Sequence, residues 1–373
     1  MARYLFASHD GFGLGHVRRN TLIARALLAG EPDAEITIVT GLPMRPAWLG
    51  DPRLHVVPVP PLLKDSDGSY HHERLSFEDA IRARAAAFTG AVRAVDPDVV
   101  VVDRHPYGLA GELRAGLDLA ASRGARLALG LRDVLDAPSV VAAELAGQGW
   151  AGVENLYDEV LVYGDPVLCD HEAEYGLPMT PRYCGWVGEP GGRPRHRDEK
   201  LLVVTGGGGG DGEAVFRLGA ELAAGLAQLH VVLVAGPYAT KDIIGALSAR
   251  ALASGRLRLV RDAPGCMDLL ARAGRVVQMA GYNSTVEALA AGLRPVLVPR
   301  RSPRREQAIR ASRLAALGLA DVVDESAPAE EVAWLLERSR LLPAGALAAV
   351  GIRLDGAARA AAAIGALAGA GLR

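Results

Sequence analysis

Residues 201–227 of the chain read LLVVTGGGGGDGEAVFRLGAELAAGLA. The apolar run 201–205 is typical of a buried strand, the glycines that follow form a turn, and 212–227 has the composition of a helix. A turn without Cβ atoms lets the backbone approach a ligand closely, and the N-terminus of the helix behind it favours a phosphate. We therefore expect an α/β unit with a ligand at this turn.

The same alternation of apolar runs and helical stretches extends in both directions. Further strands are expected at 4–7, 35–39, 54–59, 99–102, 126–129, 159–162, 231–235, 257–260, 276–279 and 295–298, with helices at 17–28, 78–94, 110–122 and 140–147. Buried strands separated by helices indicate parallel sheets covered on both faces. The Gly-, Pro- and Arg-rich stretch 185–198 has no hydrophobic period and is interpreted as a linker. The predicted fold is α/β, with two Rossmann-like parallel-sheet domains (1–184 and 199–343) facing a cleft and a helical tail at 344–373.

The composition excludes several classes of protein. The 373 residues are 50% apolar and 23% charged, as in a globular protein of two domains, and a net charge of −2 predicts no nucleic-acid partner. Cys169, Cys184 and Cys266 form no Cys-x-x-Cys pair, which indicates a reducing, cytoplasmic setting and neither a disulfide scaffold nor a thiolate zinc site. No signal-peptide pattern and no run of ~18 apolar residues occurs, so no transmembrane segment is expected.

The first strand leads into a second glycine loop, SHDGFGLGH at 8–16. The loop fails the Gly-x-Gly-x-x-Gly pattern because position 16 is His, and the turn at 206–211 lacks the Gly-Lys-Ser/Thr ending of a P-loop, so neither specifies a dehydrogenase or an NTPase. His16 opens a helix whose dipole disfavours a protonated imidazole, which suits a general base; the alternative is that His16 only caps the helix or bonds to the loop. Asp103 and His105 follow the strand 99–102, where they contact substrate or orient His16, or form a salt bridge inside the domain.

Two segments resemble metal sites superficially. Asp65-Ser66-Asp67 lies in a polar connection, where charge is typical of solvation. In His71-His72-Glu73 the side chains are adjacent in a loop, and such side chains rarely converge on one ion. No metal is expected, and 71–73 is interpreted as an acceptor-facing loop.

A third glycine-containing turn is found at 278–292, QMAGYNSTVEALAAG, followed by the strand 295–298 and a helix that opens with PRREQAIRA at 303–311. The sequence leaves structural alternatives open here. Ser284 and Glu287 have the spacing of a capping box, and Asn283 is another candidate for the N-cap. Glu306 near a helix N-terminus is also favoured by the helix dipole alone.

These strings, together with the Gly-x-Gly-His loop, resemble the GT-B glycosyltransferases. The likeness covers nearly the whole chain and is greatest to the family 28-like branch of the peptidoglycan N-acetylglucosaminyltransferase, in a bacterial subgroup of predicted glycosyltransferases. The resemblance implies that the first domain binds the acceptor and the second the nucleotide sugar. It implies an inverting, metal-independent transfer from a nucleotide-diphosphate sugar, most simply a UDP-sugar, without a cofactor, to a small-molecule or lipid-linked acceptor.

The resemblance also implies a role for each matching residue. His16 is the acceptor base or a phosphate contact, Glu287 binds the ribose, and backbone at Val260 and Arg261 meets the nucleobase. The diphosphate is expected at Ser284, Thr285 and the glycines Gly206, Gly207, Gly208 and Gly209. The donor sugar is expected at Glu306 and Gln307, and the acceptor or its support at Gly13, Gly15, Asp103 and His105. A nucleotide-sugar 2-epimerase and a non-catalytic nucleotide-sugar-binding protein remain as alternatives, and the oligomeric state is open between monomer and homodimer.

Overall fold

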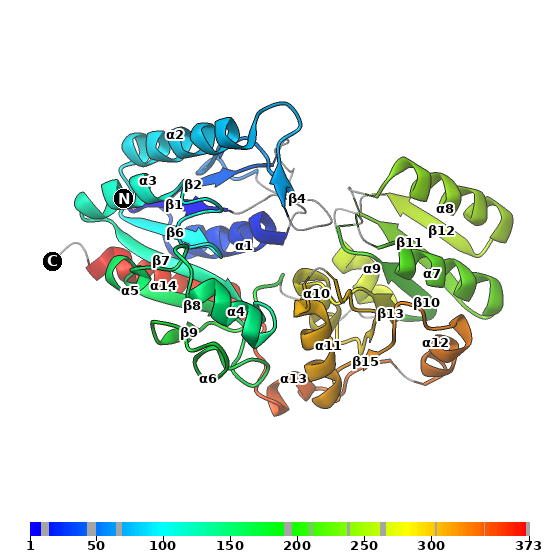
Figure 1. Cartoon of the computed structure of the whole chain (residues 1–373). Coiled ribbons are helices and arrows are strands. Elements are labelled where there is room, and N and C mark those ends of the chain that lie inside the picture. Colours follow the sequence, from blue (N-terminus) through cyan, green and yellow to red (C-terminus); the bar gives the residue numbers. More distant parts are fainter. Residues whose placement is uncertain are drawn as a thin grey trace. The chain divides into compact units, whose positions relative to one another are not determined.

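A computed structural model describes residues 1–8, 15–42, 50–64, 69–189, 196–208, 210, 212–236, 239–261, 266–302, 304–338 and 340–370. The chain divides into two compact units (Figure 1). Unit 1 comprises residues 1–187 together with 355–373, and unit 2 comprises residues 188–354.

Unit 1 is built on a seven-stranded sheet in the order β3-β2-β1-β6-β7-β8-β9, in which every pairing is parallel. Its strands are β1 (Arg3–Ala7), β2 (Glu35–Thr40), β3 (Leu54–Pro58), β6 (Val99–Asp103), β7 (Arg126–Arg132), β8 (Glu159–Tyr163) and β9 (Pro181–Tyr183). A small antiparallel hairpin pairs β4 (Leu63–Lys64) with β5 (Tyr70–His71). The helices are α1 (Gly15–Gly30), α2 (Phe77–Val95), α3 (Arg114–Ser122), α4 (Pro138–Leu145), α5 (Val153–Leu156), α6 (His171–Tyr175) and α14 (Gly356–Ala370).

Helices cover both faces of this sheet, which explains its continuous apolar strands. The central strand β6 is buried along its whole length, and its sequence is VVVVD. Helices α2 and α3 pack together over one face, while α1 and α14 pack together on the other (Figure 1). The carboxyl ends of β1 and β6, which pair with each other, therefore open at one edge of the unit.

Unit 2 repeats this plan with a six-stranded parallel sheet in the order β12-β11-β10-β13-β14-β15. The strands are β10 (Asp198–Thr205), β11 (His230–Ala235), β12 (Leu257–Arg261), β13 (Ala273–Gln278), β14 (Val296–Leu297) and β15 (Asp321–Val322). The helices are α7 (Glu213–Gly225), α8 (Lys241–Ser254), α9 (Cys266–Arg272), α10 (Tyr282–Ala290), α11 (Glu306–Ala316), α12 (Ala329–Leu336) and α13 (Ala346–Ala349). Leu202 and Val204 of β10 enter one apolar cluster with α7, while Leu201 and Val203 enter a second with α9. The strand alternation thus fills a core on each face.

Three features differ from the sequence prediction. The helix expected from 110 begins at Arg114, because Gly108 and Gly111 adopt a positive φ of 83° and turn the chain first. The short strands β4, β5, β9 and β15 were not predicted, and His71 of the expected loop 71–73 belongs to β5. The expected tail 344–373 is shared between the units: α13 lies in unit 2, whereas α14 lies in unit 1.

The expected linker 185–198 is divided in a similar way. Residues 185–187 belong to unit 1, where the Gly185 backbone N–H donates to the carbonyl of Gly164 at 3.0 Å. Residues 190–195 lie outside the described part of the chain, and Asp198 already begins β10. All three cysteines are unbridged thiols.

Candidate active site

A buried ion pair and a histidine meet where β6 ends in unit 1. Asp103 is the last residue of β6, and His16 and Arg19 lie three positions apart on α1, on one face of the helix. The Arg19 Nη2 donates to Oδ1 and Oδ2 of Asp103 at 2.8 and 2.6 Å. The His16 Nδ1 lies 3.1 Å from Asp103 Oδ2 and 3.1 Å from Arg19 Nη2. Asp103 therefore both contacts His16 and forms a salt bridge inside its own unit.

The electrostatics of this group favour an ionised Asp103. Burial of the carboxyl raises its pKa, but the charges of Arg19 and His16 and their hydrogen bonds outweigh burial and hold the pKa well below its usual range. The Asp103 side chain is fully buried, whereas that of His16 is 20% exposed. The carboxylate is consequently a fixed negative charge behind a histidine that solvent can reach.

Arg19 is a component that sequence reasoning missed. It is 2% exposed, and its guanidinium lies over the ring of Tyr163 on β8, 5.2 Å from the ring centroid. The available signal was its spacing of three residues from His16, which places both side chains on one helix face. Its partner Asp103 is 84 positions away, so the pairing required the tertiary structure.

A narrow pocket with a volume of about 20 Å³ lies beside Asp103. Its lining includes His105, Ser8 at the end of β1, and Arg84 and Phe88 of α2. The Arg84 Nε donates to Glu112 Oε1 at 3.3 Å, and both of these residues are buried. The Ser8 hydroxyl is buried without a hydrogen-bond partner. The pocket thus combines apolar walls with polar groups, and its volume has room for about one water molecule.

Part of the predicted acceptor loop falls outside the described residues, which resume at Gly15 after Ser8. Gly13 is among the residues not described, and Gly15 is the first residue of α1. Arg104, directly after Asp103, has a φ of 77°, which is rare for a residue with a side chain. Such strained backbone concentrates at functional sites.

In unit 2, the glycine turn after β10 is packed against the end of β11. A Cβ added to Gly206 would lie 2.7 Å from the Phe216 ring, and one added to Gly236 would lie 2.2 Å from the carbonyl oxygen of Gly207. Gly207 itself has a φ of 66° and open space where a Cβ would stand. Gly208 is described, whereas Gly209 lies outside the described residues. Glycine at 206 and 236 therefore serves close packing, and Gly207 leaves backbone accessible to a ligand.

Helix α10 begins earlier than the capping alternatives require. Its N-cap is Gly281, which makes no side-chain capping bond. The Ser284 hydroxyl donates to the carbonyl of Gly281 at 3.2 Å. The Ser284–Glu287 capping box and the Asn283 N-cap are therefore wrong, because both residues lie inside the first turn.

Two polar residues of α10 are buried. Thr285 is fully buried and its hydroxyl has no hydrogen-bond partner, and Glu287 is 6% exposed. Burial of a hydroxyl without a hydrogen-bond partner is unfavourable, so Thr285 is unlike an ordinary packing residue.

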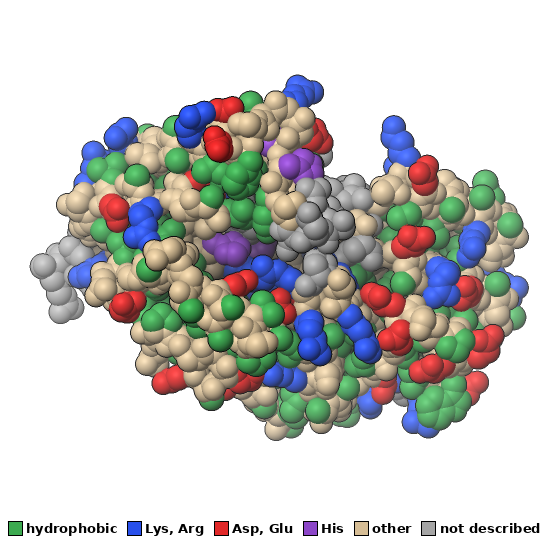
Figure 2. Space-filling model, viewed as in Figure 1, with side chains coloured by type: hydrophobic (Ala, Val, Ile, Leu, Met, Phe, Trp, Pro, Cys, Tyr) green, Lys and Arg blue, Asp and Glu red, His purple; other side chains and the backbone are tan. Residues whose placement is uncertain are grey.

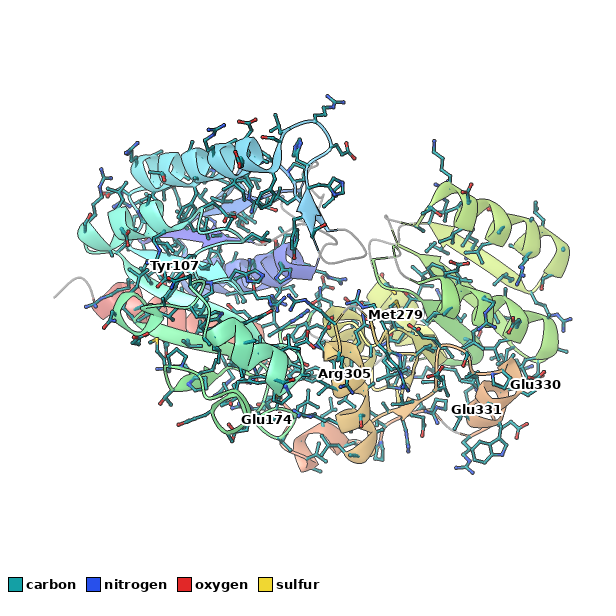
Figure 3. All side chains as sticks on the ribbon, viewed as in Figure 1. Tyr107, Glu174, Met279, Arg305, Glu330 and Glu331 are labelled. Carbon is teal, nitrogen blue, oxygen red and sulfur yellow. The ribbon has the colours of Figure 1, made fainter. Side chains whose placement is uncertain are left out.

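A hydrogen bond connects the first turns of α11 to the residues that precede α10. Glu306 and Gln307 are its first residues and are buried; Arg300 donates from Nη2 to Glu306 Oε1 at 2.9 Å and from its backbone N–H to Gln307 Oε1 at 3.3 Å. One turn later, the Arg310 Nη1 donates at 2.8 Å to the carbonyl of Ala280, which precedes α10. Figure 3 labels Met279 and Arg305, the residues near these two helix starts.

The donor candidates share one edge of the sheet in unit 2. The glycine turn follows β10, α10 follows β13, and α11 follows β14, while Val260 and Arg261 are the last residues of β12. Because these strands are parallel, their carboxyl ends lie at the same edge, where α/β sheets bind ligands. The four residues after Arg261 lie outside the described residues.

Among the described residues, no group of three or more His, Cys, Asp or Glu side chains is arranged to hold a metal ion. His72 instead accepts the backbone N–H groups of Arg74 and Leu75 with Nδ1, both at 3.0 Å, and Asp65–Asp67 is outside the described residues. None of the described helices has the length and apolar character needed to cross a membrane.

Comparison with known proteins gives structural but not sequence relatives. No protein-family model and no curated protein matches the sequence. Among solved structures, Acinetobacter baumannii MurG is 16% identical with a TM-score of 0.64, covering 98% of this chain and 100% of its own. The calicheamicin glycosyltransferase CalG4 is 20% identical with a TM-score of 0.63, covering 99% of both chains. Medicago truncatula UGT71G1, in a complex with UDP-glucose, is 14% identical with a TM-score of 0.61, covering 98% of both.

The chain has the fold of the GT-B glycosyltransferases. The likeness extends over both units and over nearly the full length of each relative. It agrees with the two parallel sheets that the alternating sequence pattern predicted. On the visible face of this GT-B chain, basic and acidic side chains are interspersed over both units (Figure 2).

Proposed function

We propose that the chain is an inverting, metal-independent glycosyltransferase that moves a sugar from a UDP-sugar to a hydroxyl group of an acceptor. Its GT-B fold is shared with MurG, with the calicheamicin glycosyltransferase CalG4 and with the Medicago enzyme complexed with UDP-glucose. The observation that carries the proposal is the contact of His16 with the buried Asp103 carboxylate at the end of the central strand β6. This is the arrangement that a general base and its orienting carboxylate require.

The proposed reaction is a single displacement at the anomeric carbon. The acceptor hydroxyl gives its proton to His16 as its oxygen bonds to that carbon on one face. The bond from the anomeric carbon to the diphosphate oxygen breaks on the opposite face, and UDP leaves with the electron pair. Attack opposite the leaving group inverts the anomeric configuration. Asp103 stabilises the imidazolium that forms, since the two groups are within hydrogen-bond distance.

Unit 2 supplies the proposed donor site. The N-termini of α10 and α11 and the accessible backbone at Gly207 favour the negative charge of a departing diphosphate. In this proposal Glu287 accepts hydrogen bonds from the ribose, Ser284 and Thr285 meet the phosphates, and Glu306 and Gln307 bind the donor sugar. The hydroxyl of the buried Thr285 has no hydrogen-bond partner, and a bound phosphate would supply one.

The test begins with binding, because the acceptor is not needed for it. Calorimetry with UDP, TDP, GDP and ADP should give tightest binding for UDP, and no binding of any diphosphate would contradict the proposal. Incubation with UDP-glucose and a panel of hydroxylated acceptors should then yield a β-glucoside, because the donor is an α-glucoside and the reaction inverts it. An isomerised nucleotide sugar formed without an acceptor would instead indicate an epimerase. Binding of UDP-glucose without formation of either product would indicate a non-catalytic binding protein.

A further inference from the structure

Arg19 is placed to decide the charge of His16. Its Nη2 lies 2.6 and 2.8 Å from the two carboxylate oxygens of Asp103 and 3.1 Å from the Nδ1 of His16. The arrangement differs from a simple histidine–carboxylate pair, because a permanent cation contacts both members. The guanidinium cannot lose its proton in a protein, so this charge is constant across the working pH range.

The charges near His16 come from more than one element. Asp103 extends from β6, Arg19 from α1, and Tyr163 of β8 lies against the far side of Arg19. Arg104, which follows Asp103, turns toward Glu144, with a closest distance of 3.7 Å. His9 and Asp10, which precede α1, lie outside the described residues. Asp103 and Arg19 are thus two charged groups of the described residues that contact His16.

A fully buried carboxylate is stable only beside a positive charge. Two groups at this site can provide that charge: Arg19, or His16 after it takes up a proton. Since Arg19 already provides it, a protonated His16 is not required for this purpose, and Arg19, 3.1 Å away at its Nη2, offsets part of the attraction of Asp103 for the imidazolium. Without Arg19, the carboxylate attracts a proton onto His16, and an imidazolium cannot accept a proton from an acceptor hydroxyl.

We propose that Arg19 is a positioning residue: it supplies the positive charge that the buried Asp103 carboxylate requires, so that protonation of His16 is not needed to balance that carboxylate. Its bidentate contact also fixes the carboxylate against which the imidazole is oriented. The catalytic meaning of this inference rests on the proposed function, but the charge of His16 can be measured without any substrate.

The experiment is a pH titration of the histidine side chains by NMR, with ¹⁵N-labelled histidine in the full chain. The His16 signals are assigned as those missing from a His16→Gln variant, since the chain has nine histidines. In Arg19→Gln, we expect the imidazolium form of His16 to persist to a pH about 1–3 units higher than in the wild type, the size of a nearby-charge effect. Arg19→Lys keeps the positive charge but loses the bidentate contact with Asp103. The pH at which the His16 imidazolium is lost should therefore change less in Arg19→Lys than in Arg19→Gln.

The matched control is Arg340→Gln. Arg340 is also a buried arginine paired with an aspartate, Asp321, but it lies in unit 2. Its loss removes a buried arginine from an ion pair whose aspartate is 23% exposed, and it should leave the His16 titration unchanged. If His16 titrates at the same pH in Arg19→Gln as in the wild type, the inference is wrong.

A second variant covers the case in which Arg19→Gln does not fold. Asp103→Asn removes the anion and leaves Arg19 as a cation beside His16, so the imidazolium should be lost at a lower pH than in the wild type. An unchanged titration in that variant also overturns the inference. If the expected shifts occur but UDP does not bind, the proposed function fails while the role of Arg19 stands.

Discussion

Replacing Gly236 with alanine tests whether the glycine turn of unit 2 is held in place by the end of β11. The added Cβ would lie 2.2 Å from the carbonyl oxygen of Gly207 and 2.3 Å from that of Gly208. Ordinary van der Waals contact begins at 3.4 Å, so these atoms overlap by more than 1 Å and the turn must move. The backbone of Gly236 does not have a positive φ, so the cost arises from this overlap and not from strain in alanine itself.

The expected loss in the free energy of unfolding is about 1–3 kcal/mol, which is typical of an overpacked site. Urea denaturation measures it, and calorimetry should show weaker UDP binding because the displaced carbonyls belong to the proposed phosphate-binding turn. The control is Gly245→Ala in the interior of α8, where the new Cβ meets nothing within 4 Å and alanine should stabilise the helix by about 0.5–1 kcal/mol. A Gly236→Ala protein as stable as the wild type, with the same UDP affinity, would refute the packing argument.

Three further outcomes are expected. Glu287→Ala should weaken UDP binding by about 1.5–3 kcal/mol in calorimetry, the contribution of a charged hydrogen bond. The control Glu221→Ala, on α7, removes a side chain that is 38% exposed and pairs with Arg217, and it should leave UDP binding unchanged. His16→Gln should retain UDP binding but lower kcat by a factor of about 10²–10⁴; an unchanged kcat in a product-release assay would exclude it as the base. Because Asp103 has a lowered pKa in the folded protein, its contribution to stability is present above its unfolded pKa and lost as the pH falls through the folded one. Urea titrations at acidic pH should therefore show stability falling less steeply in Asp103→Asn than in the wild type, and equal slopes would contradict the assignment.

The sheets could be predicted from the sequence because their strands are buried on both faces. Runs such as the valines of β6 and 201–205 are apolar without interruption, and this is the signature of a parallel strand under helices on both sides. The strands β9 and β15 have three and two residues, too few to give a pattern. The late start of α3 could not be predicted because it depends on the positive φ of Gly108 and Gly111, and the sequence does not specify φ.

The candidate site was accessible to sequence reasoning only where a residue's neighbours along the chain determine its position. Glu306 and Gln307 could be placed at a helix start because the next strand and the helix pattern were both visible. The capping box failed because α10 begins two residues before Ser284, a shift within the ordinary error of helix boundaries. Arg310 was missed because its partner, the carbonyl of Ala280, carries no mark in the sequence.

The return of the last helix to unit 1 has a consequence for engineering. Val187 and Asp355, where the chain leaves and re-enters unit 1, are paired in an antiparallel bridge, and the Gly356 backbone N–H donates to the carbonyl of Trp186 at 3.1 Å. Residues 188–354, which form unit 2, are therefore inserted between two residues of unit 1 that are adjacent in space. A short connection from 187 to 355 should leave unit 1 as a single folded domain, and another domain could be inserted between the same two residues. Truncation of the chain before residue 355, by contrast, would remove α14, which packs against α1. The helix α1, which carries His16 and Arg19, would then be exposed to solvent on that side.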